Sequence, residues 1–265
     1  MNNYRVRPGQ KVDLKEVDPD DISLAPGGKA ETLEENSRTQ ARLSRLQELL
    51  YAEHRGKLLV VLQGMDTSGK DGTIRHVMGG FNPSGTRVAS FGVPSQDELD
   101  HDYLWRIHRQ VPARGQVVVF NRSHYEDVLV VRVHELVPQS VWKKRYDQIR
   151  AFEQMLHEEG TVLLKFFLHI SKAEQRKRLQ ARIDDPTKRW KFQHGDVEER
   201  KLWPEYRRAY EDALSKTSTD ESPWYIVPAN QKWYRNFVVG SVLADTMEKM
   251  QMTYPKPDLS GIVIE

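Results

Sequence analysis

The sequence predicts an α/β fold, a three-layer α/β/α sandwich whose central parallel sheet has about five strands. Short apolar runs of strand length alternate along the chain with longer segments of helical periodicity. Such alternation is typical of βαβ units, in which helices cover both faces of a parallel sheet. The first apolar run also leads directly into a glycine-rich loop and a helix, an order typical of phosphate-binding α/β proteins.

The expected elements cover most of the chain. The strand-like runs are 57–63, 87–91, 116–121, 162–170 and 224–227. The helical segments are 31–54, 71–78, 96–109, 126–134, 139–157, 171–183, 203–216 and 233–250. Residues 1–28 carry few large apolar side chains, and we expect an extended arm there that either lies on the body or stays mobile. We expect residues 29–265 to form a single domain.

The composition narrows the functional classes. The 265 residues include 40 Lys and Arg against 38 Asp and Glu, so the net charge is only +2. This balance argues against a generic nucleic-acid binder. The absence of cysteine excludes disulfides, thiol catalysis and cysteine-based zinc sites. No apolar run has the length of a signal peptide or a membrane span, so we expect a cytoplasmic protein that does not bind membranes.

The glycine-rich loop carries the pattern Gly64-x-x-x-x-Gly69-Lys70 between the first strand and a helix. In this arrangement backbone N–H groups and the positive end of the helix face an anion, and the lysine reaches the transferred phosphoryl group. A plain glycine-rich turn would leave Lys70 unexplained. We expect phosphate to be bound by Gly64, Thr67, Ser68, Gly69, Lys70, Asp71, Gly72 and Thr73, and by Arg75 one turn later.

Asp71 stands where an ordinary phosphate-binding loop has the Ser or Thr that holds magnesium. The metal must therefore be held differently, and the carboxylate of Asp66 inside the loop is the favoured ligand. An anion beside bound phosphates would repel them unless a cation intervened. The alternative is that Asp66 only bonds the backbone of its own loop.

A polar cluster follows the third strand at residues 121–127, at the edge of the sheet where α/β proteins bind ligands. Arg122 can hold phosphate oxygens with a planar fork that never loses its charge. Glu126 or Asp127 is expected to add a second metal carboxylate. His124 is as consistent with capping or packing as with catalysis.

A basic segment, 176–192, places Arg178 and Arg182 on one helical face, four residues apart. Pro186 breaks that helix before a second basic and aromatic cluster that contains Lys188 and Lys191. We interpret residues 180–202 as a basic lid that closes over phosphates, in preference to a solvated face. Arg106 is a candidate nucleotide ligand with a surface role as the equal alternative. We expect the aromatic residues from Trp203 to Tyr234 to serve in packing.

Together these residues resemble the polyphosphate kinase 2 family. The resemblance covers roughly residues 32–250 and rests on several motifs in order. They are Gly64-Met-Asp-Thr-Ser-Gly-Lys-Asp-Gly-Thr-Ile74, Asn121-Arg-Ser-His-Tyr-Glu126, Arg182-Ile-Asp-Asp-Pro-Thr-Lys-Arg-Trp-Lys-Phe192, Tyr210-Glu-Asp-Ala-Leu214 and Pro223-Trp-Tyr-Ile-Val-Pro-Ala-Asn-Gln-Lys-Trp-Tyr234.

The resemblance implies a P-loop kinase fold with a helical lid and a reversible transfer of phosphoryl groups between inorganic polyphosphate and a nucleotide. Its catalytic residues fall on Asp66, Lys70 and Arg122. Mg²⁺ is the implied cofactor, with Mn²⁺ as an alternative, and AMP, ADP and ATP are the implied nucleotides. Members of the family are expected to form homodimers or homotetramers.

One departure from the family pattern is informative. Many members have Asp at the first position of the second motif and Asn at the sixth, whereas this chain has Asn121 and Glu126. That combination resembles class III members, which phosphorylate both AMP and ADP. The resemblance therefore assigns the metal to Asp66 and Glu126. The expected nucleotide contacts are Asn121, Glu126 and Arg106.

Two other functions remain open from the sequence. An ATP-dependent nucleoside or nucleotide kinase would keep the fold, the loop and the lid, although Asp71 disfavours it. A non-catalytic module that binds polyanions or nucleotides would not need a metal-bearing carboxylate such as Asp66 beside the phosphates.

Overall fold

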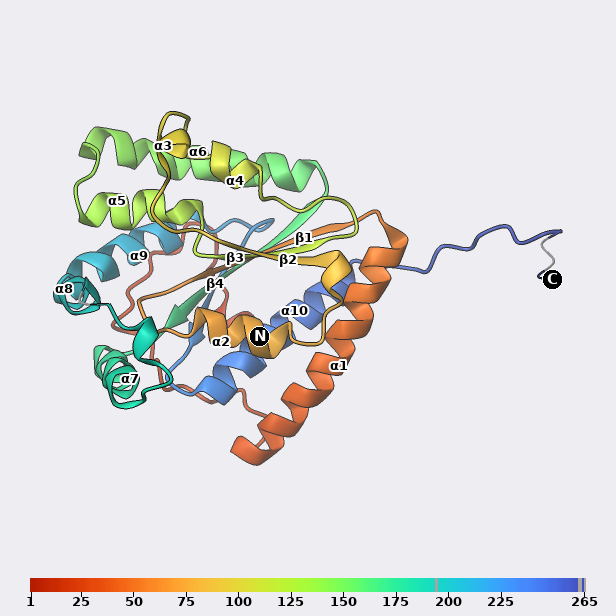
Figure 1. The fold of residues 1–265 in the computed structure, drawn as a ribbon, viewed down its shortest axis with the longest axis horizontal. Coiled ribbons are helices and arrows are strands. Elements are labelled where there is room, and N and C mark those ends of the chain that lie inside the picture. The colour runs from red at the N-terminus through yellow and green to blue at the C-terminus, as the bar shows by residue number, and fades with distance from the viewer. Residues whose placement is uncertain (194, 262–263, 265) are drawn as a thin grey trace.

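The computed structural model of the chain describes residues 1–193, 195–261 and 264, and it confirms the predicted fold class (Figure 1). Within these residues, five strands form one sheet in which every neighbouring pair is parallel. Their order across the sheet is β2-β3-β1-β4-β5. The strands are β1 (Lys57–Gln63), β2 (Thr86–Ser90), β3 (Val117–Asn121), β4 (Thr161–His169) and β5 (Trp224–Pro228).

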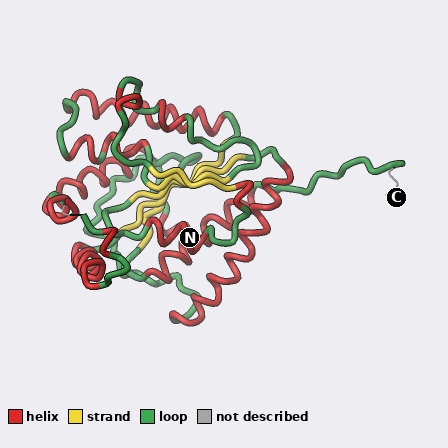
Figure 2. Tube along the Cα trace, in the orientation of Figure 1, coloured by secondary structure: helices red, strands yellow, loops and turns green. Residues whose placement is uncertain are grey.

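Helices cover both faces of the sheet, so the yellow strands of Figure 2 lie between two red layers. Helices α1, α2 and α10 pack together on one face, and α5, α6 and α9 pack together on the other. The helices are α1 (Lys29–Glu53), α2 (Lys70–Val77), α3 (Gln96–Leu99), α4 (Trp105–His108), α5 (Val130–Val133), α6 (Gln139–Glu158), α7 (Lys172–Asp184), α8 (Gly195–Lys201), α9 (Trp203–Thr217) and α10 (Lys232–Lys249).

Strand β1 lies at the centre of the sheet, between β3 and β4. Residues 58–62 have no exposed surface. A central parallel strand is covered by helices on both faces, so both sets of alternating side chains must be apolar. This explains why β1 appears in the sequence as a continuous apolar run that could be located from the sequence alone.

Residues 1–28 lie on the body of the protein, which is one of the two alternatives expected for them. Arg5 forms an antiparallel bridge with Tyr225 of the edge strand β5. The backbone N–H of Val6 donates to the carbonyl of Trp224 at 2.8 Å. The arm therefore covers hydrogen-bonding groups at one edge of the sheet. Its buried apolar side chains are Tyr4, Val6, Val12 and Leu14.

Two predicted helices are interrupted. The segment predicted as one helix over 96–109 forms the short helices α3 and α4, because the side chain of Asp102 accepts a hydrogen bond from the N–H of Leu104 at 2.9 Å and stabilises a turn between them. The segment predicted over 126–134 begins as a 3-10 helix, His124–Val128. It continues as α5 only after Leu129, whose φ of −108° and ψ of −86° are not helical.

The segment predicted as a lid, about 180–202, contains the end of α7, a 3-10 helix over Arg189–Lys191 and helix α8. Residue 194 within it lies outside the described residues. The division into an arm, residues 1–28, and a single domain, residues 29–265, stays a prediction. None of the helices in the described residues combines the length and apolar character that crossing a bilayer requires.

Candidate functional site

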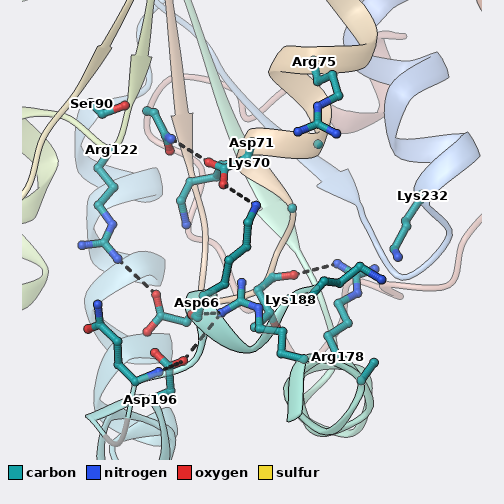
Figure 3. A pocket seen from close by; sticks show the side chains of 18 of the residues that line it. Asp66, Lys70, Asp71, Arg75, Ser90, Arg122, Arg178, Lys188, Asp196 and Lys232 are labelled. Atoms are coloured by element: carbon teal, nitrogen blue, oxygen red, sulfur yellow. Dashed lines mark hydrogen bonds and ion pairs between the residues drawn. The ribbon is translucent and has the colours of Figure 1, made fainter. Parts of the chain in front are cut away.

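A cavity of about 740 Å³ opens at the carboxyl edge of the sheet, where the loops after β1, β2 and β3 meet α7, the lid segment and the start of α10 (Figure 3). We call it the cationic cavity, because Lys and Arg predominate among its charged residues. Its cations are Lys70, Arg75, Arg122, Arg178, Arg182, Lys188, Lys191, Lys232 and Arg235, and its acidic residues are Asp66, Asp71 and Asp196.

The loop after β1 has the geometry of a phosphate cradle. Gly69 has a φ of +102°, and a β-carbon there would lie 1.9 Å from Nη1 of Arg235, so this position requires glycine. Helix α2 begins at Lys70, and the first N–H groups of a helix have no acceptor within it. The ammonium of Lys70 donates to the carbonyl of Gly64 at 2.9 Å, and burial lowers the pKa of this lysine.

Thr67 and Asp71 also face the cationic cavity. The hydroxyl of Thr67 is buried and has no hydrogen-bond partner among the described residues, so it is available to a ligand. The carboxylate of Asp71 accepts a hydrogen bond from Nδ2 of Asn121 at 2.9 Å and lies 3.6 Å from Nζ of Lys191. Asp71 therefore joins α2 to β3 and to the lid segment.

Arg178 lies at the cationic cavity, yet its guanidinium serves the protein backbone. It donates to the carbonyls of Thr67 and Ser68 at 2.9 and 3.0 Å and to the carbonyls of Ala229 and Asn230 at 2.7 and 2.9 Å. Its Nε donates to Glu174 at 2.8 Å. The N–H donors of Arg178 already have acceptors within the protein. Its side chain therefore links the phosphate loop to the β5–α10 connection.

Lys232 and Arg235 are cavity residues that the sequence analysis did not find. Arg235 is only 3% exposed, and burial and the charge of Arg178 lower its pKa. Its hydrogen bonds go to Asn236 and to the carbonyl of Ser68. No carboxylate pairs with it among the described residues. A buried guanidinium without an acidic partner is well placed to receive an anionic ligand.

The lid segment contributes cations with different surroundings. Arg182 donates to the carbonyl of Lys191 at 3.2 Å and lies 3.6 Å from Asp196, so it braces the lid segment. Lys188 is paired with Asp185 and remains largely exposed. Arg75 is exposed on α2. In Figure 3, Arg75 and Lys232 lie on the side of the cavity opposite Arg122.

A second cavity of about 330 Å³ lies beside the first, and we call it the aromatic cavity. Trp203, Tyr206 and Tyr210 of α9 line it. The Tyr206 hydroxyl donates to Glu199 at 2.6 Å, which connects α9 to α8. The expectation that the aromatic residues serve in packing is confirmed for Tyr210, Trp224, Tyr225 and Tyr234, which are buried, whereas Trp203 and Tyr206 are partly exposed in this cavity.

The two cavities meet at four shared residues: Asp66, Arg122, Gln193 and Asp196. Nη2 of Arg122 lies 3.2 Å from Oδ1 of Asp66. Burial alone would lower the pKa of Arg122, but the nearby carboxylates of Glu126 and Asp66 raise it overall. This guanidinium therefore keeps its charge at the junction.

Glu126 faces the aromatic cavity together with Asp66. It accepts a hydrogen bond from Gln63 at 3.1 Å. Burial raises the pKa of Glu126, Arg122 opposes that rise, and Asp66 adds to it. A cation between the two carboxylates would relieve this repulsion.

The donor set fits Mg²⁺ in the way this ion usually binds to phosphate-transfer enzymes. No cluster of three acidic or histidine side chains in the described part of the chain forms a complete metal centre. Mg²⁺ commonly uses one or two carboxylates and takes its other ligands from water and substrate phosphates. Asp66 and Glu126, facing one cavity, match that pattern.

Three residues considered in the sequence analysis lie elsewhere. Arg106, predicted at the nucleotide, is 7% exposed outside both cavities, where it pairs with Glu98 and donates to the carbonyl of Gly92 at 3.1 Å. Arg106 lies on the short helix α4, and its side chain points toward the β2–α3 loop. Asp127 is paired with Arg145 at 2.9 Å, so Glu126 is the carboxylate that reaches the cavity. His124 is fully buried and packs.

Comparisons with known proteins show the family to which the chain belongs. The model of the polyphosphate kinase 2 family, PPK2, matches residues 28–255. The AMP/ADP-polyphosphate phosphotransferase of Meiothermus ruber is 60% identical over 267 residues, with 100% of both chains covered. The ADP-polyphosphate phosphotransferase of Rhodopseudomonas palustris is 51% identical and covers 96% of this chain and 91% of its own.

A solved structure is also similar. The crystal structure of polyphosphate kinase 2 from Arthrobacter aurescens TC1 superposes with a TM-score of 0.94 at 45% identity, covering 97% of this chain and 92% of the other. The extent of the family match and the level of identity to these relatives show that the chain belongs to the polyphosphate kinase 2 family of phosphotransferases.

Proposed function

We propose that the protein transfers the terminal phosphoryl group of inorganic polyphosphate to ADP and to AMP, reversibly and with Mg²⁺ or Mn²⁺. The observation that carries this proposal is the junction of two cavities of different chemistry at Asp66 and Arg122. One cavity suits a long polyanion and the other suits a nucleotide. The names of the Meiothermus ruber and Rhodopseudomonas palustris relatives support these substrates.

The cationic cavity is the proposed site of polyphosphate. The loop N–H groups and Lys70 hold its reactive end, and the remaining cations follow the chain toward Arg75 and Lys232 on the opposite side (Figure 3). Lys188 and Lys191 approach from the lid segment. Arg178 and Arg182 act by holding the phosphate loop and the lid segment in place.

The aromatic cavity is the proposed site of the nucleotide. Trp203 and Tyr206 offer flat apolar surfaces to a base, and Arg122 and Glu126 lie toward the junction. The phosphates of the nucleotide would then approach Asp66. Asn121 borders the cationic cavity and supports the site through Asp71.

The chemistry needs no strong base. An oxygen of the nucleotide phosphate, already ionised at neutral pH, attacks the terminal phosphorus of polyphosphate. The bond from that phosphorus to the bridging oxygen breaks, and its electrons stay on the shortened chain. Arg122 and Lys70 neutralise negative charge on the transferred group, so positioning and charge stabilisation supply the catalysis. Asp66 and Glu126 would hold Mg²⁺, which would supply positive charge that offsets the charge of the phosphates.

The test is to incubate the protein with Mg²⁺, polyphosphate and either ADP or AMP, and to follow the nucleotide products. ATP formed from ADP, and ADP formed from AMP, are the expected results. If the phosphoryl group moves only between ATP and a nucleoside or nucleotide, the protein is an ATP-dependent kinase instead.

By family resemblance, we further propose that the protein is cytoplasmic and forms a homodimer or a homotetramer. Analytical ultracentrifugation of the purified protein tests the oligomeric state.

A further inference from the structure

Strand β4 carries a fully buried lysine in its centre. Lys165 is 0% exposed, and its ammonium lies 2.5 Å from Oε2 of Glu153, a buried residue of α6. Both residues lie outside the linings of the cationic and aromatic cavities. Burying two charges is costly unless further hydrogen bonds satisfy them. The pair therefore needs an explanation other than contact with substrate.

Further hydrogen bonds satisfy the charged groups of Lys165 and Glu153. The ammonium of Lys165 also donates to the hydroxyl of Tyr125 at 3.0 Å and to the carbonyl of Thr217 at 2.8 Å. The Tyr125 hydroxyl donates to Oε1 of Glu153 at 2.8 Å, and Nε2 of His124 lies 3.1 Å from the same oxygen. We define the Lys165–Glu153 network as Lys165, Glu153, His124, Tyr125, Thr217 and Ser222, the last of which donates to Glu153 at 3.0 Å.

The network contacts the turn that carries two proposed functional residues. His124 and Tyr125 stand in the sequence between Arg122 and Glu126. Arg122 has a φ of +63°, a conformation that a non-glycine residue adopts at a cost. Its N–H is held by the carbonyl of Leu62 at 3.1 Å. The turn is thus fixed at one end by β1 and at the other by the network.

A second wall of the aromatic cavity is also connected. Thr217 ends α9, the helix that carries Tyr206 and Tyr210, and its hydroxyl is bonded to Tyr125 at 3.0 Å and to the indole N–H of Trp224 at 2.9 Å. The network therefore joins the turn after β3 to the helix that faces it across the cavity.

We propose that Glu153 and Lys165 are positioning residues for phosphoryl transfer, which hold residues 122–126 so that Arg122 and Glu126 face the junction of the two cavities. This inference rests on the proposed function of those two residues. Glu153 acts mainly as an acceptor for His124 and Tyr125, and Lys165 balances its charge. An ion pair that only stabilised the core could be replaced by apolar residues with little loss.

The experiment compares two double variants of the full chain, Lys165→Met/Glu153→Leu and Lys165→Met/Glu153→Gln. Both remove the same two charges, but only the glutamine keeps an oxygen that accepts hydrogen bonds from His124 and Tyr125. The leucine variant should lose at least about tenfold in kcat for ADP phosphorylation. Binding of polyphosphate should persist, because most cations of the cationic cavity come from other elements. The glutamine variant should recover most of the kcat.

Thermal unfolding and calorimetric binding of polyphosphate show whether each variant is folded. If the leucine variant does not fold, Tyr125→Phe removes one hydroxyl of the network and should lower kcat by a few fold while polyphosphate binding persists. Folded leucine and phenylalanine variants with the kcat of the unaltered protein would overturn the inference. If the unaltered protein itself makes no ATP from polyphosphate, the proposed function fails instead, which separates the two outcomes.

Discussion

The cationic and aromatic cavities share four residues but have walls of different chemistry. Cations surround the first, whereas the second is lined by Val93, Val130 and three aromatic residues of α9 together with four acidic residues. A polyanion repeats the same charged unit, so a row of cations can hold it in many registers. A nucleotide has one base and few phosphates, so it needs a shaped apolar surface. If each substrate occupies its proposed cavity, a substitution should affect the binding of one substrate alone, except at the four shared residues.

The junction should show the largest effect. Arg122→Ala removes the guanidinium common to both cavities and should lower kcat about 10³-fold with either ADP or AMP, because charge stabilisation at the transferred group is lost. Steady-state rates with saturating polyphosphate measure it. Arg109→Ala, on a residue that packs over Trp105 outside both cavities, is the matched control. A similar loss in both variants would contradict the assignment.

The aromatic cavity should respond next. Trp203→Ala removes a flat surface at the proposed base site and should raise the KM for ADP about tenfold, since base–aromatic stacking contributes about 1–3 kcal/mol. The KM for polyphosphate should not change. The control is Trp105→Ala, which removes an indole that lies outside both cavities. An equal rise in both KM values for Trp203→Ala would argue against separate substrate sites.

A smaller effect is expected at the far side of the cationic cavity. Lys232→Ala should raise the KM for polyphosphate about three- to fivefold, because an exposed cation contributes up to about 1 kcal/mol. It should also make the dependence of that KM on salt less steep, while the KM for ADP stays the same. Lys249→Ala, at the other end of α10, is the control. Salt-independent rates in the unaltered protein would be inconsistent with the cationic cavity as the polyphosphate site.

The smallest effect concerns stability. Burial lowers the pKa of Lys70 below its usual 10.5, so the charged lysine destabilises the folded state at neutral pH. Without polyphosphate, Lys70→Met should therefore unfold at a higher urea concentration than the unaltered protein at pH 7.5. The gain should shrink as pH rises through 10.5, because the lysine becomes uncharged in both states only above that value. Polyphosphate should stabilise the unaltered protein more than the variant. A gain independent of pH would show that charge is not its cause.

The β-strands and the phosphate loop were predictable because their signals are local. β1 and β3 are apolar on both faces, β4 is apolar at most of its positions, and the loop after β1 combines glycines with Lys70. The helix over 96–109 was predicted wrongly, because its break depends on one side chain of Asp102 bonding to a backbone N–H. Propensity over a window does not detect such a bond.

The residues of the site divide in the same way. Asp66, Lys70 and Arg122 lie shortly after β1 and β3 in the chain and could be found from sequence, and the structure brings them to one cavity. Arg178 was expected at phosphate, but four backbone carbonyls and Glu174 use its donors. Arg235 gave no signal, because it lies within the apolar pattern of α10, far along the chain from the loop that it contacts.

Periodicity and turn chemistry act over a few residues, so local sequence is enough to predict the succession of strands and helices along the chain, the phosphate loop and the chemical types of its neighbours. Local sequence does not predict which cations face the cavity, which bind the backbone, or how Lys165 and Glu153 reach the turn after β3. Those contacts join residues from separate elements, and their partners are set by how the helices pack on the sheet rather than by spacing along the chain.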